Sequence, residues 1–431
     1  MRYYSTGGKA PLASLREVVV NGLAPDRGLY MPERIKPLPL AFFHDLPDMD
    51  LRDTAFAVAS HFFGEDVDPE ALERIVFGAL NFEIPVVEVA DPVYSLELFH
   101  GPTLAFKDVG ARFMARLLGY FNEGENRTVN VLVATSGDTG SAVANGFLGV
   151  DGVRVFVLYP KGRVSPIQEC QFTTLGQNIT ALEIDGSFDD CQALVKSAFL
   201  DPDLTARMKL TSANSINVAR FLPQSFYYYH GVGRMQRMGR GENLVVCVPS
   251  GNFGNICAAL FAVRTGLPVK RMIAANNRNE VFLQYLLTGL YSPRTSIRTL
   301  ANAMDVGDPS NFARILDLYG GDWQAIRSFI SGRSVHDGTI LTTIRDCWQE
   351  TGYLLDPHGA CGYRALVDSL REEENGLFVE TAHPAKFKET VEKAIGAPVT
   401  LPHRLAAFMQ GEKQSIPLPA DFKAFKDFLS A

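Results

Sequence analysis

The sequence predicts an α/β fold built on parallel sheets, and two observations carry this prediction. Short runs of apolar and β-branched residues recur from about residue 90 onward, each long enough for one buried strand. Stretches with helical spacing of apolar residues lie between several of these runs. Strands that are apolar throughout and alternate with helices are typical of parallel sheets covered on both faces.

Taken in chain order, the expected strands are all continuous apolar runs, at residues 129–135, 153–159, 179–184, 244–248, 269–274 and 377–380. The clearest expected helices span residues 189–200 and 255–264, where apolar side chains return with a helical period. The strands of a parallel sheet end at one edge, and ligands bind outside those carboxyl ends. Candidate site residues are therefore expected just after the strands.

The chain is expected to have three consecutive parts. Residues 1–90 are mixed in pattern and precede the candidate site residues. Residues 91–230 are expected to form a smaller α/β domain, and residues 231–431 a larger one. Two glycine-containing loops, at residues 136–140 and 250–254, are more than a hundred residues apart, and both are expected to contact one ligand. Two sheets therefore fit better than one. The prediction is therefore a ligand cleft between two α/β domains.

Composition narrows the class of protein. The chain has 431 residues, of which 46% are hydrophobic and 21% charged, as in ordinary soluble globular proteins. A net charge of -7 argues against nucleic-acid or anionic-membrane partners. The six cysteines have no CxxC or histidine-interleaved spacing, so neither a disulfide framework nor a metal site is expected. No signal peptide or membrane-spanning run is apparent, and a cytoplasmic protein is expected.

Two segments share a strand, a Ser-Gly-Asx-x-Gly loop and a helix that starts with small residues. One loop runs from Ser136 to Gly140 and the other from Ser250 to Gly254. Glycines let backbone N–H groups turn inward, and the helix N-terminus adds positive potential. A single loop of this kind is equally typical of a tight turn. A pair of them predicts that one holds a cofactor phosphate and the other a substrate carboxylate.

Lys107 is the candidate nucleophile. It follows a Gly-Pro turn and the apolar residues Leu104, Ala105 and Phe106, and it precedes Asp108. Apolar neighbours lower the pKa of a lysine and free its amine to form a Schiff base. A solvated helix start is the simpler interpretation of Lys107 alone, and the two downstream anion loops favour the Schiff-base role.

The chain resembles the threonine synthases, pyridoxal-phosphate enzymes of fold type II, the tryptophan-synthase-like group. The matching segments run nearly from end to end: residues 4–6, 99–108, 134–142, 160–166, 212–220, 249–255, 308–312 and 381–384. The segment around Lys107 is close to diagnostic of this subfamily. The resemblance implies two parallel-sheet domains around a cofactor cleft, with residues 1–90 as an N-terminal extension packed on the catalytic body.

The resemblance also implies a cofactor site for pyridoxal 5'-phosphate. Lys107 would bind the cofactor covalently and act as the catalytic acid and base. The cofactor phosphate would be held by Gly251, Asn252, Phe253, Gly254 and Asn255. The Thr381 hydroxyl would face the pyridine nitrogen, and Asp138 would lie near the phenolic oxygen.

The implied substrate contacts come from two further segments. Ser136, Gly137 and Thr139 would bind the substrate carboxylate. Further substrate contacts would come from a second segment, with Asn214, Ser215, Asn217 and Arg220. Arg220 is a candidate for the substrate phosphate, with a structural ion pair as the alternative and Lys161 and Arg163 as competitors. His100 and His383 lie inside matched motifs and are expected near the site. No metal ligand is expected.

The implied reaction converts O-phospho-L-homoserine and water to L-threonine and phosphate by γ-elimination and β-replacement. This is the chemistry of a carbon–oxygen lyase acting on phosphates. The alternatives are a serine/threonine dehydratase, which needs no second anion site, an O-phosphohomoserine phospho-lyase, and a non-catalytic relative that has kept the fold. A monomer or homodimer is expected.

Overall fold

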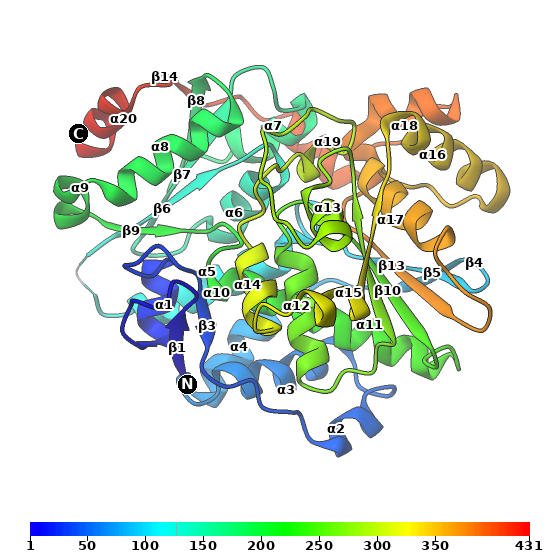
Figure 1. Cartoon of the computed structure of the whole chain (residues 1–431). Coiled ribbons are helices and arrows are strands. Elements are labelled where there is room, and N and C mark those ends of the chain that lie inside the picture. The colour runs from blue at the N-terminus through cyan, green and yellow to red at the C-terminus, as the bar shows by residue number, and fades with distance from the viewer. Residues whose placement is uncertain (126) are drawn as a thin grey trace. The chain divides into compact units, whose positions relative to one another are not determined.

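The computed structural model describes residues 1–125 and 127–431, which pack into two compact units (Figure 1). Unit 1 comprises Met1, Met31–Phe106 and Phe221–Thr400. Unit 2 comprises Arg2–Tyr30, Lys107–Arg220 and Leu401–Ala431. Each unit contains its own mostly or wholly parallel sheet, which confirms the expected α/β class with two parallel sheets.

Unit 2 is built on a five-stranded sheet whose neighbouring strands all pair in parallel. In spatial order the strands are β14 (Ile416–Pro419), β8 (Ile179–Asp185), β7 (Val153–Pro160), β6 (Val129–Ala134) and β9 (Lys209–Ser212). The three central strands are the continuous apolar runs expected from the sequence. Buried on both faces, they need apolar side chains at successive positions.

Helices cover both faces of this sheet. On one face, Leu132, Phe156 and Leu182 belong to a core that also contains side chains of α8 (Phe188–Leu200), α9 (Pro202–Arg207) and α20 (Phe422–Ser430). On the other face lies α6 (Asp138–Phe147), where a Cβ added to Gly140 would lie 2.9 Å from a methyl group of Val157. A glycine at this position therefore permits the close approach of helix and sheet.

Unit 1 is built on a six-stranded sheet. In spatial order its strands are β12 (Ile330–Ser334), β11 (Arg271–Asn276), β10 (Leu244–Pro249), β13 (Asn375–Glu380), β5 (Val93–Glu97) and β4 (Val86–Ala90). The strands pair in parallel except for β4, which pairs antiparallel with β5 at the edge. On one face Gly362 of α17 (Pro357–Val367) packs against Phe378, and on the other Gly231 of α11 (Phe226–Arg237) packs against Leu96.

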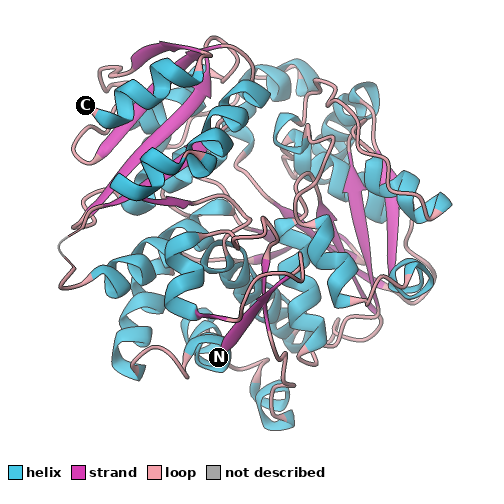
Figure 2. Cartoon of the chain, turned by 60° about the vertical axis from the view of Figure 1, so that its left-hand side comes forward, coloured by secondary structure: helices cyan, strands magenta, loops and turns pink. Residues whose placement is uncertain are grey.

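The remaining elements are short strands, helices and 3-10 turns, and Figure 2 distinguishes helices from strands by colour. The short strands β1 (Arg2–Ser5) and β2 (Ala13–Ser14) pair antiparallel, and β3 (Tyr30–Pro32) follows them. The other helices are α1 (Leu15–Asn21), α2 (Leu40–Asp45), α3 (Leu51–Phe63), α4 (Pro69–Ala79), α5 (Lys107–Asn122), α7 (Pro166–Thr173), α10 (Val218–Phe221), α12 (Gly254–Arg264), α13 (Val281–Thr288), α14 (Phe312–Leu318), α15 (Trp323–Phe329), α16 (Asp337–Thr351), α18 (Lys388–Ile395) and α19 (His403–Met409). Three 3-10 turns complete them, η1 (Leu222–Ser225), η2 (Asn302–Met304) and η3 (Pro384–Phe387).

The packing groups the chain differently from the three consecutive parts expected. Residues 401–431, expected in the larger domain, belong to unit 2, because β14 extends its sheet beside β8 and Phe425 is buried in its core. Residues 2–30 also belong to unit 2, where the Asn217 side chain donates to the Val19 carbonyl at 2.9 Å. Strand β11 begins at Arg271, two residues later than expected, because Val269 and Lys270 belong to the preceding loop.

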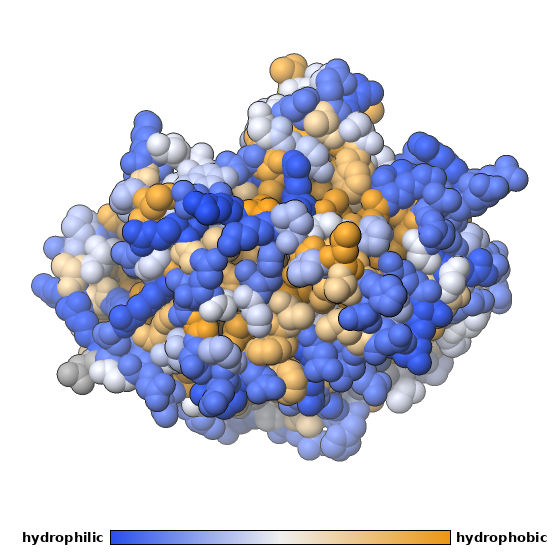
Figure 3. Space-filling model, turned by 90° about the horizontal axis from the view of Figure 1, so that it is seen from below, coloured by the Kyte–Doolittle hydropathy of each residue, from blue (hydrophilic) through white to orange (hydrophobic). Residues whose placement is uncertain are grey.

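Hydrophilic residues dominate the face seen in Figure 3, with hydrophobic residues visible between them. The helix α5 has 16 residues, fewer than the roughly 20 that span a bilayer. Across residues 1–125 and 127–431, no helix is long and apolar enough to cross a membrane.

Candidate functional site

The turn at residues 250–253 leads from β10 into α12 and forms a candidate anion cradle in unit 1. Phe253 caps the helix in a left-handed backbone conformation, with φ 62° and ψ 9°. Gly251 has no room for a side chain, because a Cβ there would lie 2.7 Å from the Met304 Cα. The first N–H groups of a helix lack intrahelical acceptors and attract anions. The turn is thus built to bring backbone donors close to a phosphate or carboxylate.

Asn255 places a side-chain donor in the first turn of the same helix. Its Oδ1 accepts hydrogen bonds from the Tyr227 and Tyr228 hydroxyls, both at 2.6 Å. These bonds occupy the oxygen of the amide, and Nδ2 is buried without a hydrogen-bond partner among the described residues. A buried unpartnered donor is costly. An anion bound at this helix start would satisfy it.

The other two side chains of the turn are used within the protein. Asn252 Oδ1 accepts from the Ser310 N–H at 2.7 Å, and the Asn252 carbonyl accepts from Asn311 Nδ2 at 3.0 Å. The Phe253 ring packs against Phe282, with ring centroids 4.6 Å apart. Asn252 and Phe253 therefore shape the turn through these contacts, and their main chain remains the part available to an anion.

Lys107 begins α5 directly after a segment that is held against the end of β13 in unit 1. The Phe106 N–H donates to the Thr381 carbonyl at 2.9 Å. Ala105 forms an antiparallel bridge with Ala382. Thr381 is buried, and Lys107 is half-buried. The backbone before the lysine and the backbone of the candidate pyridine-facing threonine are thus fixed to each other by the same pairing.

The second loop, between β6 and α6, lies in unit 2 and is internally braced. The Thr135 hydroxyl accepts from the Gly137 and Gly140 N–H groups at 2.9 and 2.8 Å. Gln168 Nε2 donates to Asp138 Oδ1 at 2.9 Å, and both residues are buried. Sequence reasoning missed Gln168, because it lies 30 residues away from Asp138 and just beyond the matched 160–166 segment.

Arg220 lies against the helix that starts with Lys107. A Cβ added to Gly110, three residues after Lys107, would lie 2.7 Å from Arg220 Nη1 and 2.2 Å from its carbonyl oxygen. Arg220 is 2% exposed, whereas Lys161 and Arg163 are exposed on the turn after β7. Of the three basic candidates for the substrate phosphate, Arg220 alone is therefore buried within unit 2 beside the first turn of α5.

The polar residues before Arg220 divide into two groups. Asn217 Nδ2 donates to the Val19 and Ser212 carbonyls, and Asn217 Oδ1 accepts from the Ala219 N–H. This buried amide is occupied by the backbone, so we assign Asn217 a structural part. Asn214 and Ser215 are half-buried, and Asn214 Oδ1 is buried without a hydrogen-bond partner in the part of the chain described here.

A buried acid and histidine cluster adjoins Thr381 in unit 1 and was not anticipated from the sequence. Glu380 Oε1 accepts from the Asp356 N–H at 2.7 Å, and both carboxyl groups are fully buried. Burial and then the neighbouring Asp356 charge raise the pKa of Glu380 well above its usual range. The Ala303 N–H donates to His358 Nε2 at 3.2 Å, so His358 Nδ1–H donates to Asp356 Oδ1 at 2.5 Å. In the sequence, Asp356 is typical only of a helix N-cap, because it directly precedes Pro357.

The two histidines from the matched motifs lie near this cluster. His100 Nε2 lies 2.7 Å from Glu97 Oε2, and the Phe99 ring contacts the His383 ring edge-on with centroids 5.2 Å apart. Burial, with His100 nearby, lowers the pKa of His383 to about 4. His383 is therefore a neutral imidazole at physiological pH, and its Nδ1 accepts from the Ala385 N–H.

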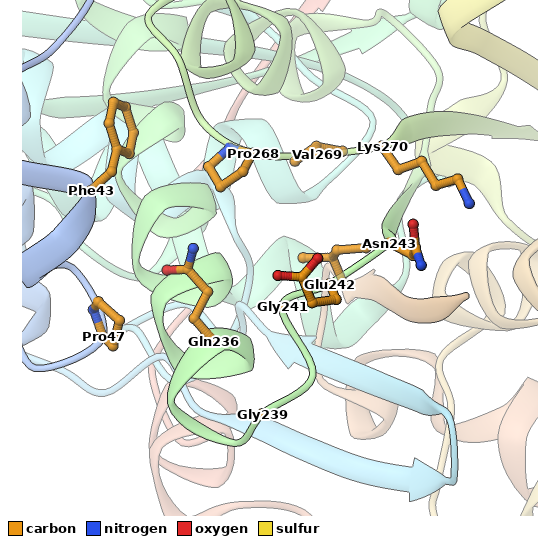
Figure 4. Close-up of a pocket in the computed structure, with 11 residues that line it drawn as sticks. Phe43, Pro47, Gln236, Gly239, Gly241, Glu242, Asn243, Pro268, Val269 and Lys270 are labelled. Atoms are coloured by element: carbon orange, nitrogen blue, oxygen red, sulfur yellow. The ribbon is translucent and has the colours of Figure 1, made fainter. Parts of the chain in front are cut away.

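A surface pocket of about 610 Å³ lies elsewhere in unit 1, among Phe43, Gln236, Asn243 and Lys270 (Figure 4). It also includes Leu244, the first residue of β10. The turn 250–253 follows the last residue of this strand, and six strand residues span about 20 Å. The pocket and the anion cradle are therefore at opposite ends of β10.

Three family profiles match the chain. The profile described as "Pyridoxal-phosphate dependent enzyme" matches residues 87–380. "Threonine synthase N terminus" matches residues 2–80, and "Threonine synthase, C-terminal" matches residues 359–429. Together these three matches reach from the first strand to the last helix.

Individual proteins agree over the full length. The chain is 44% identical to the threonine synthase of Serratia marcescens over 430 residues, covering 100% of this chain and 99% of the relative. The crystal structure of threonine synthase from Escherichia coli superposes with a TM-score of 0.93 at 42% identity, covering 100% of this chain and 99% of that one. The PLP-bound threonine synthase from Brucella melitensis also reaches a TM-score of 0.93, at 34% identity, covering 100% and 98%.

Proposed function

The chain belongs to the threonine synthase family of pyridoxal-phosphate-dependent lyases, and from this premise we propose how its own residues perform the reaction. The reaction is the conversion of O-phospho-L-homoserine and water to L-threonine and inorganic phosphate. The observation that carries the proposal is the pair of features in unit 1 that meet the needs of the cofactor. These are the turn at residues 250–253 with Asn255, and the pairing of Phe106 with Thr381.

The residues of this turn fit a phosphate group. Gly251 allows close approach of the backbone, and α12 presents its first N–H groups. Asn255 Nδ2 is a buried donor for which the described residues supply no acceptor. Phosphate oxygens are strong acceptors, so we assign the cofactor phosphate to the N–H groups at the start of α12 and to Asn255 Nδ2.

Lys107 and Thr381 take the roles at the reacting end. Pyridoxal phosphate, when bound, supplies an electron sink for the carbanion formed at the substrate Cα. Lys107 removes the Cα proton, and the flexible four-carbon stem lets its amine serve the neighbouring carbons afterwards. The Thr381 hydroxyl would face the pyridine nitrogen and would add no charge there. The pairing at residues 104–106 supports these roles, because it holds the backbone before Lys107 in one place.

The substrate anions are assigned to unit 2. The N-terminus of α6, with Ser136, Gly137 and Thr139, binds the substrate carboxylate, and Gln168 holds the Asp138 side chain beside it. Arg220 binds the substrate phosphate, supported by its burial beside the first turn of α5. Asn214 and Ser215 supplement it, and Asn214 Oδ1 is available to a substrate ammonium or hydroxyl.

The direct test is a product analysis. The purified chain, loaded with pyridoxal phosphate, is incubated with O-phospho-L-homoserine, and threonine and phosphate are measured together. We expect equal amounts of both products. Phosphate release with a 2-oxo acid or an unsaturated amino acid in place of threonine would indicate a phospho-lyase. Ammonia release from serine or threonine without use of the phosphorylated substrate would indicate a dehydratase.

Cytoplasmic action as a monomer or homodimer is part of this proposal. Support comes from the six cysteines, all of which are free thiols, as is usual in a reducing compartment. Light scattering of the purified chain measures the oligomeric state, and a mass above that of a dimer would contradict the proposal.

A further inference from the structure

We propose that Asn311 and Arg314 are positioning residues that hold the turn at residues 252–253 in the shape required for binding the cofactor phosphate. They lie at the start of α14, which packs beside α12 within unit 1 (Figure 1). The proposal rests on the proposed function, because it takes the anion at α12 to be the phosphate of pyridoxal phosphate. It gives a role to the 308–312 segment, which the sequence singled out without one.

The turn needs support from outside itself. Phe253 has a left-handed backbone, a conformation that a bulky residue adopts only where its surroundings hold it. The first N–H groups of α12 follow directly, so their direction depends on the backbone at Asn252 and Phe253. A small rotation at either residue would turn these donors away from a common point.

Asn252 is held on both its side chain and its main chain by the 310–311 segment. The Ser310 N–H donates to Asn252 Oδ1 at 2.7 Å, and Asn311 Nδ2 donates to the Asn252 carbonyl at 3.0 Å. Both bonds come from a part of the chain nearly 60 residues away. The turn therefore keeps its shape only while Asn311 keeps the orientation of its amide.

Arg314 fixes that orientation. Its Nη1 donates to Asn311 Oδ1 at 2.5 Å. Arginine can only donate, so the Asn311 oxygen must face Arg314 and the Asn311 nitrogen must face the Asn252 carbonyl. The Arg314 guanidinium is itself locked, since it is 0% exposed and its Cζ lies 4.0 Å from the centre of the Phe221 ring. The hydrogen bonds thus run in one direction, from Arg314 to Asn311 to the turn.

Burial also gives Arg314 an electrostatic part. Desolvation lowers the pKa of Arg314 to about 9, which still leaves it charged at neutral pH. A buried positive charge behind an anion-binding turn is screened less by salt than a surface charge. The charge and the hydrogen-bond chain both favour an anion at α12. A lysine at 314 would keep the charge and an ammonium donor but lose the planar guanidinium fork.

The test titrates the apo protein with pyridoxal phosphate and, separately, with pyridoxal, which lacks the phosphate. Asn311→Leu keeps the branched shape of the side chain and removes both amide hydrogen bonds, and Arg314→Met keeps apolar packing on Phe221 and removes the charge. We expect each variant to lower the affinity for pyridoxal phosphate about tenfold or more, while the affinity for pyridoxal stays within about twofold of the wild type. The ³¹P resonance of the bound cofactor should shift and broaden in both variants. Arg314→Lys should recover part of the affinity lost in Arg314→Met.

The matched control is Arg271→Met. Arg271 is another largely buried arginine of unit 1, bound to Glu374 at the opposite end of the same sheet, with Nη2 2.6 Å from Oε2. This variant should lower the melting temperature but leave the ratio of pyridoxal phosphate to pyridoxal affinity unchanged. If Asn311→Leu or Arg314→Met does not fold, as judged by circular dichroism, Arg314→Lys alone decides. Its affinity ratio should fall about threefold.

If the variants lost affinity for both ligands equally, or if the ratio of pyridoxal phosphate to pyridoxal affinity did not change, the assignment to Asn311 and Arg314 would be overturned. A wild-type chain that bound pyridoxal phosphate no better than pyridoxal would instead overturn the phosphate site and the proposed function with it. The two failures are therefore distinguishable in the same titration.

Discussion

At the scale of single residues, the geometry of the candidate site is set by neighbours that do not themselves react. The backbone before Lys107 is fixed by Thr381 and Ala382, the Asp138 carboxylate is held by Gln168, and the Asn255 amide is oriented by two tyrosine hydroxyls. Precise placement of reacting groups depends on such supports, because small displacements are costly in catalysis. Substitutions at a reacting residue and at its support should therefore have different signatures.

Lys107→Ala is expected to fold and to lose all turnover, because in the proposed mechanism the Lys107 amine is both the covalent anchor of the cofactor and the mobile base. Borohydride treatment followed by mass spectrometry should trap the cofactor on the wild type and not on the variant. Lys386→Met is the matched control, since Lys386 is a buried lysine whose Nζ donates to the Thr103 carbonyl at 2.8 Å. It should lose thermal stability and still be trapped at Lys107. Turnover above a trace in Lys107→Ala would contradict the assignment.

Glu380→Gln is expected to change how stability depends on pH. The folded pKa of Glu380 is raised above its unfolded value of 4.5 by burial and by Asp356. The folded state therefore binds more protons than the unfolded state above pH 4.5, and this contribution to stability is lost as pH rises toward the folded pKa. Glutamine mimics the protonated acid, so the variant should gain melting temperature relative to the wild type between pH 5 and 8.

Glu374→Gln is expected to change stability in the opposite direction to Glu380→Gln. Hydrogen bonding to Arg271 lowers the pKa of the Glu374 carboxyl to about 2, so its contribution is present above pH 4.5 and is lost on acidification toward pH 2. This variant should be less stable than the wild type at pH 7, with the difference shrinking as pH falls.

The prediction for Glu380 has its own contradicting outcome. Parallel pH profiles of stability for the wild type and Glu380→Gln would show that Glu380 is ionised in the folded state.

At the scale of elements, each strand-to-helix transition of the site depends on a short turn that the rest of the unit supports. The C-terminal elements show the same dependence, since β14 lies beside β8 and α20 packs its apolar face on the sheet of unit 2. Residues 401–431 are therefore part of the α/β core of unit 2 and not an appendage to it.

Phe425→Ala tests this placement of α20. Phe425 is fully buried with Phe156 and Leu158, and truncation should leave a cavity that costs about 3–5 kcal/mol of unfolding free energy. Lys426→Ala, on the next residue, removes an ion pair to Asp201 and should have a much smaller effect. Denaturant titration of both variants measures the difference. Similar midpoints for Phe425→Ala and the wild type would place α20 outside the core.

At the scale of the whole molecule, a chain of net charge -7 must bind a substrate that carries a carboxylate and a phosphate. Bulk charge opposes this binding, and surface charges are screened beyond about 8 Å at physiological salt. The attraction must therefore come from local donors. Among the basic candidates, Arg220 has the burial that makes a single charge effective.

Arg220→Ala is accordingly expected to raise the KM for O-phospho-L-homoserine about tenfold or more, through loss of charge-assisted hydrogen bonds. Affinity for pyridoxal phosphate should stay unchanged, because we assign the cofactor phosphate to the start of α12. Arg163→Ala, on the exposed turn after β7, is the control and should leave KM nearly unchanged. A weakened cofactor with an unchanged KM would move Arg220 to the cofactor, and a larger effect in Arg163→Ala would move the substrate phosphate to that turn.

Most of the central strands and both glycine loops could be predicted because their signals are local. A continuous apolar run such as Val245–Val248 followed by Pro-Ser-Gly-Asn specifies strand, turn and helix within a dozen residues. Five strands of the two large sheets are not among the predicted ones: β4 and β5 of unit 1, and β9, β12 and β14. In β9, β12 and β14, the segments Lys-Leu-Thr-Ser, Ile-Ser-Gly-Arg-Ser and Ile-Pro-Leu-Pro carry no continuous apolar run. These strands form because an existing sheet edge offers backbone partners.

The sequence by itself therefore determined the α/β class, the resemblance to threonine synthases, the candidate lysine and the two candidate anion-binding loops. Only the tertiary structure decided which distant residues support them: Gln168 on Asp138, Asn311 and Arg314 on the 252–253 turn, and His358 on the loop at Ala303. It also decided that residues 401–431 complete the sheet of unit 2. The physical reason is range, because strand and turn propensities act between near neighbours, whereas burial and hydrogen-bond pairing join residues whose separation along the chain leaves no local pattern.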